Sequence, residues 1–330
     1  MRCLTPGCDV QTLFYRLTMD TATEFLFGES VECQGRDDEV GGGCGFAAMF
    51  NRAQTIMSRR VLMRTFYWLA DGKEYAEANK VVHEFVDGYV DRALESDEKK
   101  VHEGRYVFLD ALVEDTRDRK MLRDQLLNIL LAGRDTTANL LSWAVHLLAN
   151  DARVYDKLRE SVLGAFGEDS VDAITFESLK GLKYLRFVLN EVLRLYPSVP
   201  QNFRFAIRDT VLPRGGGKDK TEPVVVSRGM AVFYNVFAMH RRKDLYGDNA
   251  NEFVPERWEG RSAGWEYLPF NGGPRICLGQ QYALTEAGYV LARLVQTFKS
   301  VQSHDTGRQV KVRALLTMMK PDGVHVTFHY

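Results

Sequence analysis

Residues 118–150 carry the longest uninterrupted helical pattern in this chain of 330 residues. The stretch reads DRKMLRDQLLNILLAGRDTTANLLSWAVHLLAN and contains no proline. At about 1.5 Å per residue, a helix of this length runs about 50 Å, which is the width of a whole domain. It must therefore cross the molecule, and the rest of the chain has to pack around it.

The middle of this helix, AGRDTT, has poor helix-forming chemistry. Gly, Asp and Thr each weaken a helix interior relative to Ala. Ile129, Gly133, Thr136 and Leu140 share one face, so the missing side chain of Gly133 and the hydroxyl of Thr136 point the same way. Two interpretations stay open. The glycine allows another helix to approach closely, or it opens a groove over a flat ligand, with a hydroxyl and the Asp135 carboxylate beside it.

The remaining pattern is mostly helical, with short strands in the C-terminal half. Apolar spacing predicts helices over 9–28, 46–60, 73–97 and 176–200. Val, Phe and alternating polar residues predict strands over 203–213, 223–227 and 230–237, and a hairpin over 313–330 with PDG at its turn. Residues 31–45 and 97–105 read as a Gly-rich loop and a charged linker. The fold class is mainly α with a small β portion. We expect one domain over 1–330, helical over 1–200, with the strands, the glycine-rich loop, a further helix and the hairpin in 201–330.

Composition narrows the class of protein. Apolar residues make up 45 % of the chain, charged residues 26 %, and the net charge is −1. This balance describes a soluble globular protein and gives no support to a nucleic-acid partner, which would favour a basic excess. Five cysteines without a signal peptide predict reduced thiols in an intracellular protein. No apolar run reaches the length that would predict a membrane span.

Two charged residues on the predicted helix 176–200 stand in an apolar setting. Glu191 and Arg194 are three residues apart and therefore neighbours on one face. Their apolar flanks predict that the pair is buried, and a buried pair needs further partners to offset its desolvation. Arg257, in the stretch FVPERW, is the candidate partner.

A rigid loop presents one cysteine at the start of an apolar helix. The stretch FNGGPRICLGQQYALTEAGYVLARLVQTF begins at Phe270, and three glycines and a proline surround Cys277. The residues alone leave three roles open for this thiol: a buried structural cysteine, a reactive nucleophile or a metal ligand.

The loop resembles the haem-binding loop of the cytochrome P-450 superfamily. Its pattern F-x-x-G-x-R-x-C-x-G is matched by Phe270, Gly273, Arg275, Cys277 and Gly279. AGRDTT, Glu-x-x-Arg at 191–194 and PERW resemble the other motifs of that family and follow in the expected order. The stretches LTMDTATEFLFGES, LPRGGG and AMHRRKDLYGDNANEFVPERW are similar to the fungal branch that hydroxylates n-alkanes and fatty acids.

The resemblance implies a cytochrome P-450 fold and assigns roles to the residues around the thiol. Cys277 becomes the axial ligand of the haem iron, and thiolate ligation promotes O–O cleavage. The other implied cofactor contacts are Phe270 of the motif, Gly273 and Gly279 around the sulfur, and Arg275 and Arg204 on the haem propionates.

On the other haem face, the resemblance implies that Gly133 leaves room for dioxygen. Asp135 and Thr136 become the acid–alcohol pair that relays protons. Glu191, Arg194 and Arg257 become a buried triad that supports the Cys loop from behind, with a structural role.

The implied function is a haem-thiolate monooxygenase that hydroxylates a hydrophobic substrate, a fatty acid or an n-alkane. Its cofactor would be haem b, and its co-substrates O2 and NADPH, with electrons delivered by NADPH-cytochrome reductase. Two alternatives are a haem-thiolate isomerase or lyase acting on hydroperoxides, and a non-catalytic remnant. The Asp135–Thr136 pair argues against the isomerase, which has no use for a proton relay.

Family members of this branch begin with a membrane anchor for the endoplasmic reticulum, followed by several helices. One of those helices holds a propionate with Trp and Arg. Nothing in this chain matches these segments, and it carries no anchor or signal peptide, so we expect an N-terminally truncated form. We also expect the 330 residues alone to be poorly soluble and to hold haem weakly, because the haem pocket would lack one wall.

Overall fold

The computed structural model describes residues 7–35, 45–95, 106–168, 170–305 and 310–330. Its helices are α1 (Val10–Phe27), α2 (Gly45–Met63), α3 (Lys73–Glu95), α4 (Phe108–Asp115), α5 (Arg119–Asn150), α6 (Ala152–Phe166), α7 (Phe176–Gly181), α8 (Lys183–Leu195), α9 (Val236–Met239), α10 (Lys243–Tyr246) and α11 (Gln280–Thr297). The short 3-10 helices are η1 (Cys33–Gly35), η2 (Arg64–Ala70), η3 (Pro255–Trp258) and η4 (Gly273–Arg275). The protein is therefore mainly α, as its sequence predicts.

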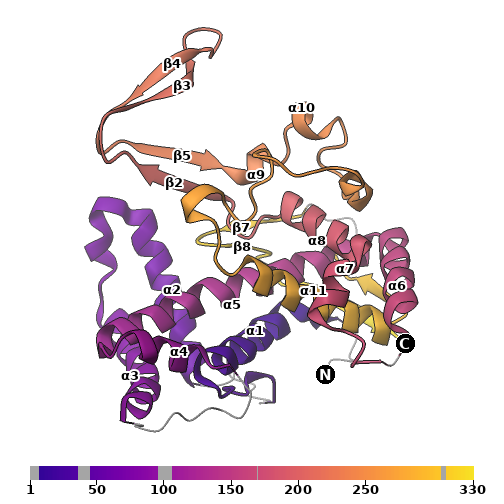
Figure 1. The fold of residues 1–330 in the computed structure, drawn as a ribbon, viewed down its shortest axis with the longest axis horizontal. Coiled ribbons are helices and arrows are strands. Elements are labelled where there is room, and N and C mark those ends of the chain that lie inside the picture. The colour runs from indigo at the N-terminus through magenta and orange to yellow at the C-terminus, as the bar shows by residue number, and fades with distance from the viewer. Residues whose placement is uncertain (1–6, 36–44, 96–105, 169, 306–309) are drawn as a thin grey trace.

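Helix α5 crosses the molecule and the other long helices pack around it (Figure 1). Its N-cap is Asp118, whose side chain accepts the N–H of Met121 at 3.0 Å. Helices α1, α3, α8 and α11 all contact it. The prediction of a crossing helix over 118–150 is confirmed.

Two hydrophobic cores lie along α5. One surrounds its N-terminal half and unites α1, α2, α3 and α4, with Leu122, Leu126 and Leu130 fully buried. The other surrounds its C-terminal half and unites α6, α8 and α11 around Trp143. Fully burying a Leu or Val side chain stabilises a fold by about 1.5–3 kcal/mol. The helix therefore serves as the common wall of both cores.

The remaining predicted helices compare well with the structure. The pattern over 9–28 is α1, and it ends at Gly28, which adopts a left-handed φ of 78°. The predictions over 46–60 and 73–97 correspond to α2 and α3. The predicted helix over 176–200 is two helices, α7 and α8, because Leu182 takes extended backbone angles and caps both. Helices α4, α6, α9 and α10 were not predicted, and α9 begins at Val236, within the predicted strand over 230–237.

The strands form small antiparallel sheets in four groups. They are β1 (Cys8–Asp9), β2 (Gln201–Phe205), β3 (Thr210–Gly216), β4 (Glu222–Val226), β5 (Ala231–Asn235), β6 (Ser300–Ser303), β7 (Arg313–Ala314), β8 (Met318–Met319) and β9 (His325–His329). The pairs are β2–β5, β3–β4 and β7–β8, and a three-stranded sheet has the order β1–β9–β6. The predicted strand over 203–213 is divided between β2 and β3, and the β3–β4 hairpin projects from the body (Figure 1).

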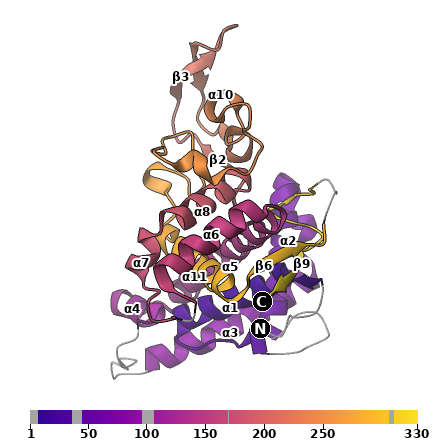
Figure 2. The same ribbon diagram turned by 90° about the vertical axis from the view of Figure 1, so that its right-hand side faces the viewer.

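The predicted hairpin over 313–330 is wrong in its pairing. The PDG turn is present, with Gly323 at a φ of 74°. However, the strand after the turn, β9, pairs with β6 and β1 (Figure 2), while β8 before the turn pairs with β7. The C-terminal strand is therefore the central strand of a three-stranded sheet, and the local hairpin is limited to β7–β8.

Three further predictions concern the cysteines, the loop and linker segments, and membrane-spanning helices. The prediction of reduced thiols is wrong at Cys8, which is disulfide-bonded, whereas the thiol of Cys277 is free. The linker 97–105 and most of the loop 31–45 lie outside the described residues. Within the described ranges, no helix is both long enough and apolar enough to cross a membrane.

Candidate functional site

The Cys loop, residues 270–279, is a tight turn between η3 and α11. Its N–H at Cys277 donates to the carbonyl of Phe270 at 2.8 Å, which closes the loop. Asn271 and Gly273 both have positive φ, 66° and 70°, a region that glycine enters without steric cost. Gly279 has a negative φ and caps α11. The loop thus delivers Cys277 just before the N-terminus of a long helix, as the sequence predicts.

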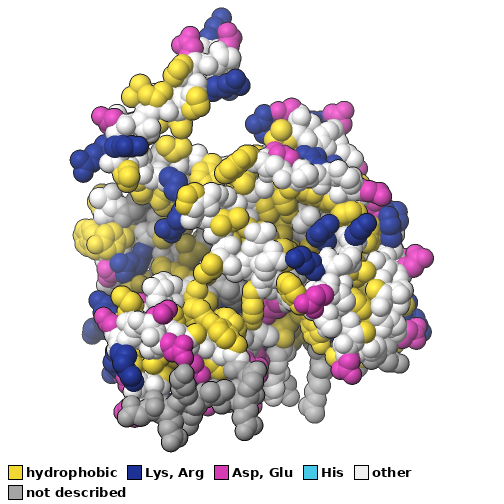
Figure 3. Space-filling model, viewed as in Figure 1, with side chains coloured by type: hydrophobic (Ala, Val, Ile, Leu, Met, Phe, Trp, Pro, Cys, Tyr) yellow, Lys and Arg dark blue, Asp and Glu magenta, His cyan; other side chains and the backbone are white. Residues whose placement is uncertain are grey.

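The thiol of Cys277 is exposed and lies in an apolar setting. Ile276 and Leu278, on either side of it, are 55 % and 92 % exposed. The neighbouring β2–β5 pair also exposes aromatic side chains, among them Phe203 and Phe233. Figure 3 shows hydrophobic side chains gathered on this face between the strands and the helical body. Exposed apolar surface of this kind marks a site that a hydrophobic ligand or another surface covers.

Strands β2 and β5 bring a positive charge to the Cys loop. The Tyr234 hydroxyl on β5 donates to Asn271 Oδ1 at 2.9 Å, which ties the strand to the loop. The Arg204 guanidinium on β2 lies 5.8 Å from the centre of the Tyr234 ring and donates to the carbonyl of Phe203 at 2.8 Å. Arg275, within the loop, is exposed. The structure therefore brings the loop and Arg204 together, as expected.

The residues fit a haem. A large apolar disc with two carboxylates needs one soft axial ligand, apolar surface and cations at its edge. The chain offers the Cys277 thiol, the exposed apolar residues beside it, and Arg204 and Arg275. A Cβ added at Gly133, Gly273 or Gly279 would meet no atom within 4 Å, so these glycines leave open space.

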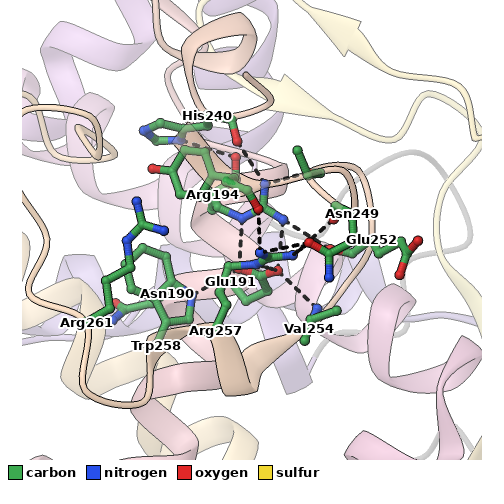
Figure 4. Close-up of polar contacts among 12 residues, drawn as sticks. Asn190, Glu191, Arg194, His240, Asn249, Glu252, Val254, Arg257, Trp258 and Arg261 are labelled. Carbon is green, nitrogen blue, oxygen red and sulfur yellow. Dashed lines mark hydrogen bonds and ion pairs between the residues drawn. The ribbon is translucent and has the colours of Figure 1, made fainter. Parts of the chain in front are cut away.

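Behind the loop lies the buried cluster of Glu191, Arg194 and Arg257 (Figure 4). Both Glu191 oxygens pair with Arg194 at 2.8 Å, and Arg257 Nε donates to Glu191 Oε1 at 2.8 Å. Glu191 and Arg194 are fully buried. The prediction that these three side chains meet in the protein interior is confirmed.

Further partners complete this buried cluster. Glu191 also accepts the N–H of Val254 and the indole N–H of Trp258, both at 3.0 Å. Arg194 donates to the carbonyls of His240, Ala250 and Glu252. Each charge is thus satisfied by hydrogen bonds as well as by its counter-ion, which is what a buried ion pair needs. Only Arg257 was predicted, because the other partners come from distant positions with no local pattern.

The middle of α5 does not place Asp135 and Thr136 together. The Thr136 hydroxyl donates to the carbonyl of Ala132 at 2.7 Å, one turn back in the helix. Asp135 pairs with Arg134 at 3.1 Å and lines a pocket of about 320 Å³ between α1, α2 and the β7–β8 connection. Adjacent residues on a helix do not face each other. The expected acid–alcohol pair therefore consists of two groups that point in different directions.

The surroundings of Asp135 favour its protonated form. Burial raises the pKa of this carboxyl, and the Arg134 charge opposes that effect. Arg134 is itself buried, hydrogen-bonded to Asn51 of α2, and its guanidinium lies 5.2 Å from the ring centre of Tyr15. A raised pKa at a pocket makes this carboxyl a candidate for proton transfer. Arg134 and its partners were not predicted from the sequence.

A second carboxyl with a raised pKa, Glu286, lies half-buried on α11, nine residues after Cys277. Glu286 accepts a hydrogen bond from the Thr21 hydroxyl of α1. Burial raises the pKa of Glu286 to about 7. The folded state therefore binds a proton more tightly than the unfolded chain, and the stabilisation it gives is present at low pH and lost as pH rises toward 7.

We expect Glu286→Gln to remove this pH dependence. Glutamine keeps the acceptor for Thr21 but needs no proton. The variant should gain up to about 3 kcal/mol of stability over wild type between about pH 5 and about pH 8, at about 1.4 kcal/mol per unit of pKa shift. Urea unfolding at several pH values measures the difference, and Glu77→Gln, at an exposed position of α3, is the control. A constant difference across this range would contradict the assignment.

An α-helical fold with an exposed thiol on a glycine-rich loop, supported by a buried Glu–Arg–Arg cluster, defines a haem-thiolate class of protein. The family model of cytochrome P450 matches residues 2–328. The chain belongs to the cytochrome P450 family.

Curated relatives agree with the family. The chain is 51 % identical to cytochrome P450 52A12 of Debaryomyces hansenii and to cytochrome P450 52A3-A of Candida maltosa, and 48 % identical to cytochrome P450 52A1 of Candida tropicalis. In each case the alignment covers 97 % of this chain. It covers 65 %, 64 % and 62 % of the three relatives, so the chain spans less than two thirds of their length.

Proposed function

We propose that the protein is a haem-thiolate monooxygenase that inserts one oxygen atom of O2 into a C–H bond of a hydrophobic substrate, a fatty acid or an n-alkane. The single observation that carries this proposal is the exposed Cys277 thiol on its closed loop. A catalytic or metal-binding cysteine needs access, whereas a structural cysteine is normally buried. The membership of the chain in the cytochrome P450 family, and its similarity to the cytochrome P450 52A proteins, support the same class of enzyme, a haem-thiolate monooxygenase.

In this proposal the Cys277 thiolate would hold the iron of haem b, and Arg204 and Arg275 would neutralise its propionates. Thiolate-bound iron supplies the activation of O2. The chain's own residues hold the thiolate in place through the Phe270 carbonyl and the buried triad behind the loop. Gly133 leaves space beside α5, since a side chain there would meet no neighbouring atom.

Proton supply is assigned to Asp135 and Thr136 in separate roles. The raised pKa of Asp135 favours a carboxyl that carries a proton, and its pocket opens toward polar side chains of α1 and α2. The Thr136 hydroxyl, bonded to Ala132, can turn from that carbonyl toward a ligand at the helix surface. Electrons come from NADPH through NADPH-cytochrome reductase, and the protein resides at the endoplasmic reticulum membrane. These last points follow the family resemblance.

In a form of the protein that binds haem fully, the proton roles predict two different defects. Thr136→Ala should keep haem but divert reducing equivalents into peroxide, because the bound oxygen loses its ordered donor. Asp135→Asn should lower the turnover rate by about 10²–10⁴-fold through loss of general acid delivery. Product formed per NADPH consumed, measured with fatty-acid and alkane substrates, separates the two.

Thr137→Ala provides the matched control, since Thr137 is buried on α5 next to the proposed donor. It should leave the ratio of product to NADPH unchanged. Wild-type coupling in both Thr136→Ala and Asp135→Asn would contradict the two proton roles, whereas conversion of a hydroperoxide without NADPH consumption would favour the haem-thiolate isomerase.

A further inference from the structure

His240 lies between the buried triad and the Cys loop. It follows α9, is fully buried, and has both ring nitrogens engaged. Its Nε2 accepts the backbone N–H of Leu268 at 2.9 Å. Because Nε2 is an acceptor, the ring proton sits on Nδ1, which donates to the carbonyl of Arg194 at 3.2 Å.

The same histidine is joined to Arg194 a second time. Arg194 Nη1 donates to the His240 backbone carbonyl at 2.8 Å, so the two residues hold each other by side chain and backbone (Figure 4). The Tyr267 ring stacks on the imidazole with ring centres 5.2 Å apart. The imidazole therefore has one fixed orientation and one tautomer.

The contacts of His240 continue along the loop to the backbone of Cys277. The backbone N–H of Leu268 donates to His240, and the carbonyl of Leu268 accepts a hydrogen bond from the N–H of Asn271 at 3.2 Å. The next residue back, Phe270, accepts the N–H of Cys277. A short series of hydrogen bonds thus connects Arg194 of the triad with the backbone of Cys277, and the His240 side chain is its bridge.

The surroundings keep this bridge neutral. Burial lowers the pKa of His240 to about 4, and the charges of Arg194 and Arg241 act in the same direction. A protonated imidazole would present N–H at Nε2 and lose its bond from Leu268. Around neutral pH the acceptor is therefore always available.

We propose that His240 is a positioning residue that transmits the placement of the Glu191–Arg194–Arg257 triad to the Cys loop. It sets the loop through Leu268 and so fixes where the Cys277 sulfur is presented. This inference rests on the proposed role of Cys277 as the haem ligand, and it gives the triad a route to the ligand rather than a general stabilising effect.

Three substitutions separate the hydrogen bonds of His240 from its shape. His240→Phe keeps a ring for Tyr267 but accepts nothing from Leu268. His240→Gln places an amide oxygen at the distance of Nε2 and restores that acceptor. In His240→Asn the side chain is too short to accept the N–H of Leu268, and its amide can reach only the carbonyl of Arg194. Tyr155→Phe, which removes a buried 2.8 Å hydrogen bond to Phe298 elsewhere, controls for a simple loss of stability.

Amide hydrogen exchange of the peptide over 262–279 is the primary readout, because it does not require haem. In His240→Phe and His240→Asn we expect exchange in this peptide to accelerate by about tenfold to a hundredfold, with the peptide around Trp258 unchanged. His240→Gln should restore wild-type protection, and Tyr155→Phe should leave it intact. In the haem-loaded protein, the Phe and Asn variants should lose the red-shifted Soret band of the reduced CO complex at equal haem content.

Unchanged exchange in the Phe and Asn variants would overturn the proposal, as would failure of glutamine to restore protection. If His240→Phe does not fold, the Gln and Asn variants decide, since they differ only in reach to Leu268. A failure of Cys277 as the haem ligand would leave the exchange pattern as expected and remove only the spectral effect, so the two failures are distinguishable.

Discussion

Glu191→Gln is expected to destabilise the fold more than any other single change of charge in this chain. The substitution keeps the size and shape of the side chain but removes its negative charge. Arg194, which is fully buried, and Arg257, whose side chain is 9 % exposed, would then face each other without a counter-ion. Breaking a buried ion pair in this way costs about 3–5 kcal/mol, a large part of the typical 5–15 kcal/mol stability of a domain.

Urea unfolding and haem content per chain measure this loss. Glu74→Gln is the matched control, because the same substitution there breaks an exposed pair with Arg52, worth about 0–1 kcal/mol. We expect the Glu191 variant to hold little or no haem. Arg194 donates hydrogen bonds to backbone carbonyls in the segment 240–252, which precedes the Cys loop, and this segment would lose its anchor. A wild-type unfolding midpoint in Glu191→Gln would contradict the structural role of the triad.

The sequence was most informative where a local pattern determines structure. The period of α5 and the spacing of Glu191 and Arg194 depend on helix geometry alone, and both are found as predicted. Glycines and a proline around Cys277 predict a tight turn for the same reason, since backbone angles are a local property. The burial of the pair also followed from its apolar neighbours.

The sequence was least informative where partners come from far along the chain. The PDG turn forms as its residues require, yet β9 pairs with β1 and β6, about 317 and 26 positions away on average, because sheet pairing is decided by packing of the whole molecule. Trp258 and His240 reach the triad from separate segments with no periodic signal. Asp135 and Thr136 are neighbours in sequence, but the helix turns them apart.

Cys277→Ser is expected to have the largest effect on function. Serine preserves the size of the side chain and leaves the backbone bond from residue 277 to Phe270 in place. It removes the sulfur, and a neutral hydroxyl cannot replace a thiolate as an electron-rich ligand. We expect loss of all oxygenation activity, with little change in the unfolding midpoint because Cys277 is exposed and buries no side chain.

The most direct test is the spectrum of the reduced CO complex in wild type and Cys277→Ser, at equal haem content. We predict a red-shifted Soret band in wild type and none in the serine variant. Cys33→Ala is the control, since Cys33 is buried in the core around the N-terminal half of α5 and is not part of the Cys loop. It should retain the band. A red-shifted band that survives in Cys277→Ser would show that another atom holds the iron, and would contradict the account.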